Sequence, residues 1–283
     1  MQVHPKQPIH ATRWLISLLV LAAILLSGHL AFAASPELDR GYRNMYNLDF
    51  PAAHVEFKSW IEKQPEDPLG PVSDAAAFLF AEFDRLHVLD VELFADDDRF
   101  VSRKRPAPNP QLRAAFNQRT QQADSLADAI LKNAPNNAHA LFAKTLVCGL
   151  RSDYAALIDK SDLTALKLTQ QGSKYADLTL QADPQLYDAH LATGVENYML
   201  SLKPAPVRWF IHMTGGATDK AKGMAELRVT AEHGHYLAPF ARLMLAVAEL
   251  REGNKDQAKA LLAGLAKEFP QNTLYSRQLS RIQ

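Results

Sequence analysis

The sequence predicts an all-α protein built as an array of antiparallel helix pairs, and three observations lead to this prediction. Alanine and leucine are abundant and β-branched residues are sparse after the first thirty or so positions, which favours helices because unbranched side chains lose little rotamer freedom there. No segment alternates between apolar and polar residues between turn signals, as a half-buried strand would. A spacing of small residues and prolines also recurs along the chain.

Length and charge narrow the classes of protein that fit. The chain has 283 residues, of which 47% are hydrophobic, so it can form one large core or one elongated array. It carries 31 basic and 31 acidic residues. This balance gives no basic excess that would indicate a nucleic-acid partner.

The first 33 residues are predicted to be a secretory signal peptide. Lys6 and Arg13 give a positive start, and residues 14–26 are apolar apart from one serine. Small residues one and three positions before the cut place cleavage after Ala33, so the protein is expected to be exported, either periplasmic or secreted. The alternative is an uncleaved anchor, although the apolar run is shorter than the roughly 20 residues that a span needs. No integral membrane span is expected after the cleavage point.

Residues 34–283 are predicted to form a single helical-repeat domain. In four places a small residue is followed four positions later by a packing residue, and eight positions after that by a proline. The four sets are Ala53, Phe57 and Pro65; Ala123, Ala127 and Pro135; Gly172, Ala176 and Pro184; and Ala258, Leu262 and Pro270. Gly41, Gly194 and Ala246 occupy the equivalent close-approach position on the preceding helices. Small residues let two helices cross closely, and the proline ends each unit.

This spacing resembles the tetratricopeptide repeat (TPR), a helix-turn-helix unit of about 34 residues. The first unit, 34–68, and the last, 237–270, match best, and the centre is irregular. Because 49 residues separate Pro135 from Pro184, we expect an insertion at 151–161. A further pair is expected before Pro270, with Gly234 ending its second helix. The resemblance implies an α-solenoid whose first helices line a curved inner surface.

The predicted helices follow from these units. They cover about 36–47, 51–63, 69–86, 110–133, 137–150, 162–182, 186–202, 218–233, 236–252, 255–268 and 271–281, with a short additional helix considered at 205–213. A polar, proline-punctuated loop is expected at about 96–110. Residues 207–211 form a Trp-containing apolar cluster, which either packs under the array or contacts a partner or a membrane surface peripherally.

A second resemblance covers residues 186–233. A helix with Gly194 and Tyr198 leads through an apolar turn to a glycine-rich segment, 215–223, and a helix beginning at Met224. This arrangement resembles exported bacterial TPR proteins and the Iml2-like TPR group of the mitochondrial outer membrane. The resemblance implies helical-repeat architecture without known catalysis.

No catalytic, metal or cofactor motif is complete, so no catalytic residue, metal site or cofactor is predicted. The acidic run 96–98 lacks the alternating ligands and the glycine of a calcium loop. His233 and His235 lack a third ligand, and histidines beside a helix-ending glycine explain them equally well. Cys148 is the single cysteine and lies in an apolar helical stretch, where a buried small hydrophobe is the simpler interpretation.

The predicted function is that of an exported scaffold that binds a protein or peptide on its inner surface, in envelope assembly or transport. The residues expected to face inward are His139, Phe142, Leu146, Asp188, Leu191, Val195, Tyr198, Phe240, Leu243 and Val247. Two alternatives remain. One is a helical envelope enzyme acting on glycans or lipids, which would need a pocket joining Glu196, Arg208 and His212. The other is a structural component that fills space in a larger complex.

Overall fold

The computed structural model describes residues 35–88, 107–203, 208 and 218–282. By its contacts the chain divides into two units, residues 1–36 and 37–283, and the second unit is the one described below. The predicted signal peptide, most of the loop at 96–110 and all of residues 207–211 except Arg208 lie outside the described residues. The described part is all-α, as predicted, and contains no strand.

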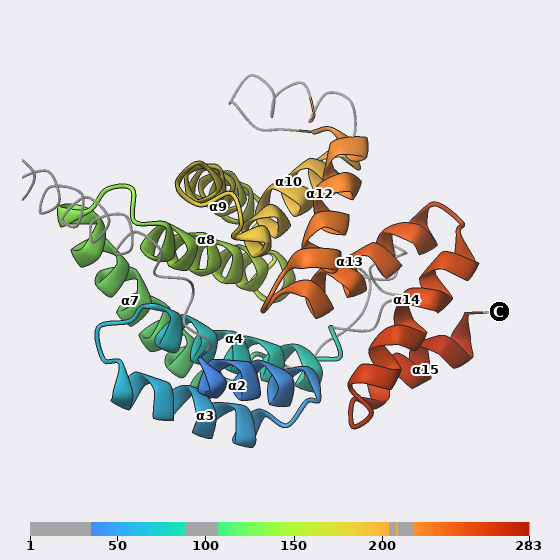
Figure 1. The fold of residues 1–283 in the computed structure, drawn as a ribbon. Coiled ribbons are helices and arrows are strands. Elements are labelled where there is room, and N and C mark those ends of the chain that lie inside the picture. Colours follow the sequence, from blue (N-terminus) through green and yellow to red (C-terminus); the bar gives the residue numbers. More distant parts are fainter. Residues whose placement is uncertain (1–34, 89–106, 204–207, 209–217, 283) are drawn as a thin grey trace, which may run out of the picture. The chain divides into compact units, whose positions relative to one another are not determined.

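The helices form five consecutive pairs and one final helix within the described residues (Figure 1). The pairs are α2 (Pro36–Tyr46) with α3 (Phe50–Lys63), α4 (Leu69–Arg85) with α7 (Pro110–Asn133), α8 (Ala138–Asp153) with α9 (Asp162–Ala182), α10 (His190–Ser201) with α12 (Lys220–His233), and α13 (Ala238–Arg251) with α14 (Lys255–Glu268); α15 (Thr273–Arg281) follows. Each predicted helix in these ranges is present, and most ends agree within two or three residues. The short helix considered at 205–213 falls almost entirely outside the described residues.

The four repeat prolines end their helices as predicted. The helices α3, α7, α9 and α14 have their C-caps at Gln64, Ala134, Asp183 and Phe269, each of which directly precedes a repeat proline. Their ψ angles lie between 68° and 99°, because the proline ring excludes the preceding residue from the helical region. In the pair α10 and α12, Gly234 takes the C-cap position instead.

The small residues of the repeat lie where two helices cross. Ala53, Ala123 and Ala258 are each 0% exposed, and Gly172 is buried as well. A side chain on Gly41 would overlap the ring of Phe57, so this pair depends on the missing Cβ. The predicted packing role of these positions is therefore confirmed, since any larger side chain would push the helices apart.

The extra length predicted at 151–161 is a helical extension. Helix α8 runs to Asp153 and continues as a π-helix over Tyr154–Ile158 before α9 begins. The Tyr154 ring stacks on Phe116 of α7, with ring centroids 4.9 Å apart. The irregular centre of the array is thus a longer first helix with a wider turn at its end.

The first helix pair packs against the last one. The ring of Tyr42 stacks on that of Tyr236 with centroids 4.7 Å apart, and the Tyr46 hydroxyl donates to the Tyr236 carbonyl at 2.9 Å. The Asn272 side chain donates to the Tyr46 carbonyl at 2.8 Å. Phe80 of α4 also meets Phe240 of α13 edge to face. These contacts fill much of the inner face, which an open solenoid would leave exposed to solvent.

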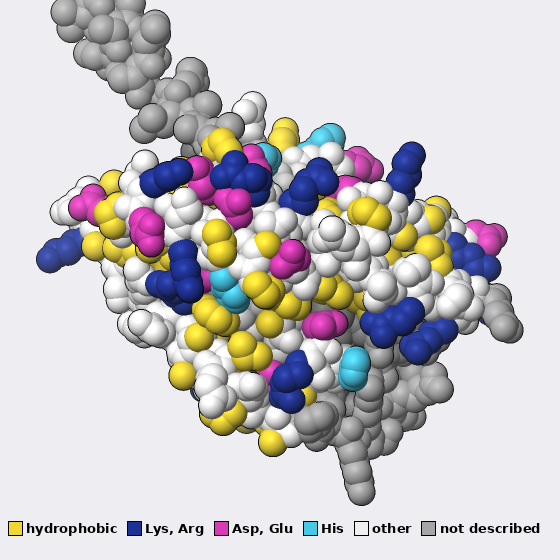
Figure 2. Space-filling model, turned by 90° about the horizontal axis from the view of Figure 1, so that it is seen from below, with side chains coloured by type: hydrophobic (Ala, Val, Ile, Leu, Met, Phe, Trp, Pro, Cys, Tyr) yellow, Lys and Arg dark blue, Asp and Glu magenta, His cyan; other side chains and the backbone are white. Residues whose placement is uncertain are grey.

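Charges of both signs are interspersed over the face seen in Figure 2, with apolar side chains between them. Within the described ranges no helix has the length and apolar character needed to cross a membrane.

The crossing of α10 and α12 provides a test of the packing. A Cβ on Gly223 would lie 2.5 Å from the Tyr198 nitrogen and 2.9 Å from the Gly194 carbonyl oxygen, and backbone atoms cannot move aside. We expect Gly223→Ala to lower the free energy of unfolding by about 1–3 kcal/mol. The matched control is Gly264→Ala, where a Cβ meets nothing within 4 Å, and we expect a gain of about 0.5–1 kcal/mol. Denaturant unfolding measures both, and equal effects would contradict this crossing.

Candidate functional site

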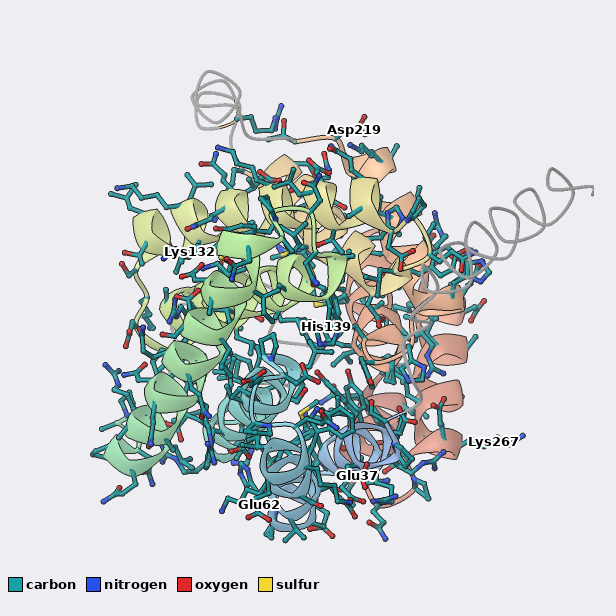
Figure 3. The ribbon with its side chains drawn as sticks, turned by 60° about the vertical axis from the view of Figure 1, so that its left-hand side comes forward. Glu37, Glu62, Lys132, His139, Asp219 and Lys267 are labelled. Atoms are coloured by element: carbon teal, nitrogen blue, oxygen red, sulfur yellow. The ribbon has the colours of Figure 1, made fainter. Side chains whose placement is uncertain are left out.

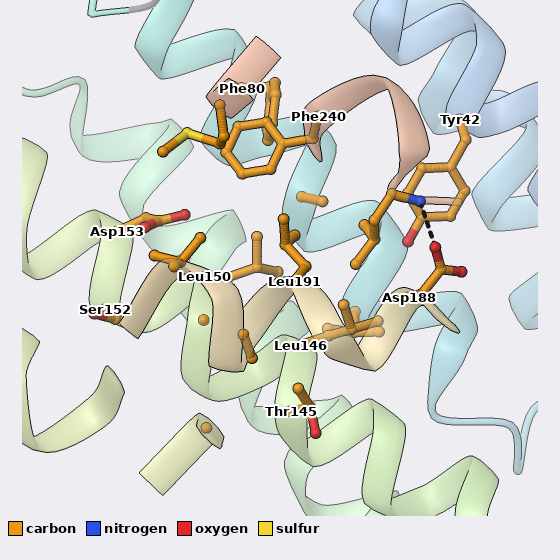
Figure 4. Close-up of a pocket in the computed structure, with 18 of the residues that line it drawn as sticks. Tyr42, Phe80, Thr145, Leu146, Leu150, Ser152, Asp153, Asp188, Leu191 and Phe240 are labelled. Carbon is orange, nitrogen blue, oxygen red and sulfur yellow. Dashed lines mark hydrogen bonds between the residues drawn. The ribbon is translucent and has the colours of Figure 1, made fainter. Parts of the chain in front are cut away.

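A pocket lies on the inner face, and the first helix of each of the five pairs contributes to it (Figure 4). The pocket and the solvent space at its open mouth together have a volume of about 950 Å³. The walls are mainly apolar: Tyr42, Met45 and Tyr46 from α2; Val72, Ala76 and Phe80 from α4; Leu146, Gly149 and Leu150 from α8; Leu191, Ala192 and Val195 from α10; and Phe240 and Met244 from α13. Thr169 and Gly172 of α9 complete the lining beside α8. Convergence of all the first helices makes this the candidate site.

The ten residues predicted to face inward do not all line the pocket. The five that line the pocket are Leu146, Asp188, Leu191, Val195 and Phe240. Phe142, Tyr198 and Val247 lie in the core with exposures of 0%, 0% and 2%, and Leu243 is buried as well. That these ten residues contact a partner stays a prediction.

His139 is paired at the start of α8. Its Nε2 lies 2.6 Å from the Asp67 Oδ1, and it sits between the green and the cyan helices in Figure 3. Asp67 also accepts from the Trp60 indole at 2.8 Å. Burial alone would raise the pKa of Asp67, but the bonds from His139 and its other donors hold it below the usual value. His139 therefore joins the turn between the first and second helix pairs to the third pair.

Asp188 has a structural role that the sequence did not indicate. Its two carboxylate oxygens accept from the Tyr236 and Leu237 backbone N–H groups, both at 3.0 Å. Burial raises the pKa of Asp188, and these backbone bonds oppose that rise. A Cβ on Gly234 would lie 2.5 Å from the Asp188 Oδ1, which explains the glycine between His233 and His235. The carboxylate thus holds the chain entering α13 and leaves little capacity for a partner.

Asp153 is the polar residue of the pocket that sequence reasoning missed. It lies at the junction of α8 and the π-helix, and it is partly buried among apolar walls at the end of the pocket opposite Asp188 (Figure 4). No hydrogen bond or ion pair involves its carboxylate in the described part of the chain. Burial raises its pKa to about 7. Its spacing from Leu146 and Leu150 could have revealed it, since all three share one helical face.

The polar atoms beside Asp153 are already bonded to one another. The Ser152 hydroxyl donates to the Ala165 carbonyl at 3.0 Å and lies 2.7 Å from the Thr169 hydroxyl. Among the described lining residues, Asp153 is therefore the group with free hydrogen-bonding capacity. A carboxyl whose pKa is raised by burial in a cleft is a candidate for a functional site.

The structure gives little support to the other residues considered for catalysis or metal binding. Cys148 is buried, and burial raises the pKa of its thiol to about 11, so the thiol is neutral near pH 7. Glu196 and Arg208 do not line the pocket, and His212 lies outside the described residues. Within the described ranges no three His, Cys, Asp or Glu side chains are grouped as metal ligands would be.

Among solved structures, the chain is similar to a thermophilic TPR protein of Thermus thermophilus. The sequence identity is 15% and the TM-score is 0.45, and the match covers 88% of this chain and 98% of that one. No protein-family model matches the chain, and no curated protein matches it in sequence.

The cost of burying Asp153 can be measured through pH. Its pKa is about 7 in the folded protein, well above the 3.8 that is usual for an aspartate, so the folded state favours the protonated acid. The destabilisation is complete above pH 7 and disappears as the pH falls towards 4. We expect Asp153→Asn, which mimics the protonated acid, to raise the Tm at pH 8 by at least about 2–4 °C. The difference should vanish near pH 4, and a variant of equal or lower Tm at pH 8 would contradict the assignment.

Proposed function

We propose that this protein is a binding scaffold that holds an apolar segment of a protein partner in its inner pocket. The observation that supports the proposal is the convergence of the first helices of all five pairs on one mainly apolar cavity. Helical arrays of this kind bury one face against their neighbours and use the inner one for binding. Apolar pockets with a few polar groups suit extended peptides or helices inserting side chains.

An enzyme acting on glycans or lipids is less favoured. Paired carboxylates can serve as acid and base only when both are available. The pocket has Asp153 and Asp188, and the second is held by two backbone N–H groups. A binding site does not need two available carboxylates. It therefore accounts for this pocket with fewer functional groups than an enzyme would need.

We further propose that the protein is exported and works in the periplasm or outside the cell, in envelope assembly or transport. The proposal is supported by the positive start, the apolar run and the small residues before Ala33, which together are typical of a cleaved signal.

A pocket-filling variant tests the binding site. Gly149 lines the pocket, and a Cβ there would meet nothing within 4 Å. Gly149→Leu should therefore fill the cavity while improving helix propensity. We expect peptides selected from a random library on the wild-type protein to bind Gly149→Leu at least tenfold more weakly. Fluorescence anisotropy measures the Kd values.

The matched control for the pocket variant is Gly264→Leu on the exposed side of α14. It introduces the same side chain away from the pocket, so peptide affinity should stay at the wild-type value. Failure to enrich any peptide, or equal binding to both variants, would refute the pocket as the binding site.

Export is tested by the amino terminus of the protein in its host. We expect mass spectrometry of the periplasmic or secreted fraction to find a chain beginning at Ala34. Replacing Ala31 and Ala33 by lysine should block processing, since signal peptidase needs small residues there. A full-length chain confined to the cytosol would contradict the proposal.

A further inference from the structure

Among the described residues, Asp153 is an acid without a partner, whereas the other polar side chains of the pocket lining are hydrogen-bonded. Its carboxylate faces the cavity at the end away from Asp188 (Figure 4). Buried polar groups are normally hydrogen-bonded, and an unpaired carboxyl in apolar surroundings is destabilising. The presence of this destabilising carboxylate is explained if Asp153 pairs with a complementary group of a bound ligand.

Two charged groups of neighbouring helices, Arg113 and Glu82, are engaged elsewhere. From α7, Arg113 lies over the Tyr154 ring and pairs with Asp159. From α4, Glu82 pairs with Arg85. The hydroxyls of the two lining tyrosines are also bonded, Tyr42 accepting from Ser73 and Tyr46 donating to Tyr236.

The pocket lining itself contributes no positive charge. Among the described lining residues there is no lysine, arginine or histidine. Burial is accordingly the sole cause of the raised pKa of Asp153, and no neighbouring charge acts on it. A ligand would thus find an apolar channel with the unpaired Asp153 carboxyl at one end and the Asp188 carboxylate, held by two backbone N–H groups, at the other.

We propose that the pocket is specific for an aliphatic chain that ends in a primary ammonium, such as a lysine side chain of the bound partner, and that Asp153 pairs with this ammonium. The inference rests on the proposed binding function and names the group that the same pocket accepts. The apolar walls would contact the methylene stem, and the carboxylate would meet the charge.

Lysine fits this pocket better than the other charged side chains. Its ammonium is a compact charge on a four-carbon apolar stem. The arginine guanidinium carries five donors in a planar fork, and one carboxylate would leave several of them unsatisfied. A carboxylate ligand would be repelled by Asp153 and would find no cation in the lining.

The pairing makes binding depend on pH in a defined direction. An ammonium with a pKa near 10.4 stays charged throughout, so Asp153 is the group that titrates. With its pKa at about 7, roughly one tenth of the carboxylate is ionised at pH 6 and about nine tenths at pH 8. Affinity for the ammonium should therefore be about tenfold higher at pH 8 than at pH 6.

The test uses the full chain and three probes of equal length: n-octylammonium, n-octanol and octanoate. Their Kd values are measured by NMR titration at pH 6 and pH 8. At pH 8 we expect the ammonium to bind about tenfold more tightly than the alcohol, with octanoate the weakest. At pH 6 the preference for the ammonium should fall by about tenfold, while the affinity for the alcohol should not change.

Two variants distinguish the proposed pairing of Asp153 with the ammonium from general effects on ligand binding. Asp153→Asn should abolish the preference for the ammonium and its pH dependence while keeping the affinity for octanol. Asp177→Asn, which removes an exposed carboxylate from α9, should behave as the wild type. Octanol binding without a preference for the ammonium, or a preference that survives in Asp153→Asn, would overturn this inference alone. Failure of all three probes to bind would overturn the inference together with the pocket of the proposed function.

Discussion

Tyr236 is the point on which the closure of the array depends. Its ring stacks on Tyr42 and its carbonyl accepts from Tyr46, both on the first helix pair. Its N–H is held by Asp188, which lies in the short turn of helix just before α10. One short segment before α13 therefore joins the first, fourth and fifth pairs. The Asp188 carboxylate accepts two backbone bonds there, and hydrogen bonds to a charged group are the stronger kind.

The pocket is a consequence of this closure. Bringing α2 and α4 against α13 buries Tyr46 and Phe80 and fills much of an inner face that would otherwise be an open groove. What remains is a cavity bounded by all five first helices. A pocket bounded by several helices has room for a side chain, whereas an open groove accepts a length of chain. The proposed binding function would therefore be more selective here than in an open solenoid.

Part of the candidate site could be predicted and part could not. Repeat register placed Leu146, Leu191 and Phe240 on the inner face, because helical periodicity determines which side a residue takes. The same reasoning included Phe142 and Val247, which are buried in the core, since periodicity does not distinguish a residue covered by a neighbouring helix from one that borders a cavity. Asp153 was missed because it lies where α8 runs on into the π-helix, beyond the predicted end of the helix.

The helices, most of their ends and their pairing could be derived from the order of the residues. They depend on groups close in the chain: prolines that exclude the helical conformation just before them, and small residues that permit close crossing at regular spacing. The closure of the array could not be derived in this way, and it became visible only in the folded chain. The contact between Tyr46 and Tyr236 joins residues 190 positions apart, and nothing in local spacing specifies such a partner. The same closure makes Asp188 hold a backbone turn and leaves Asp153 facing an apolar cavity.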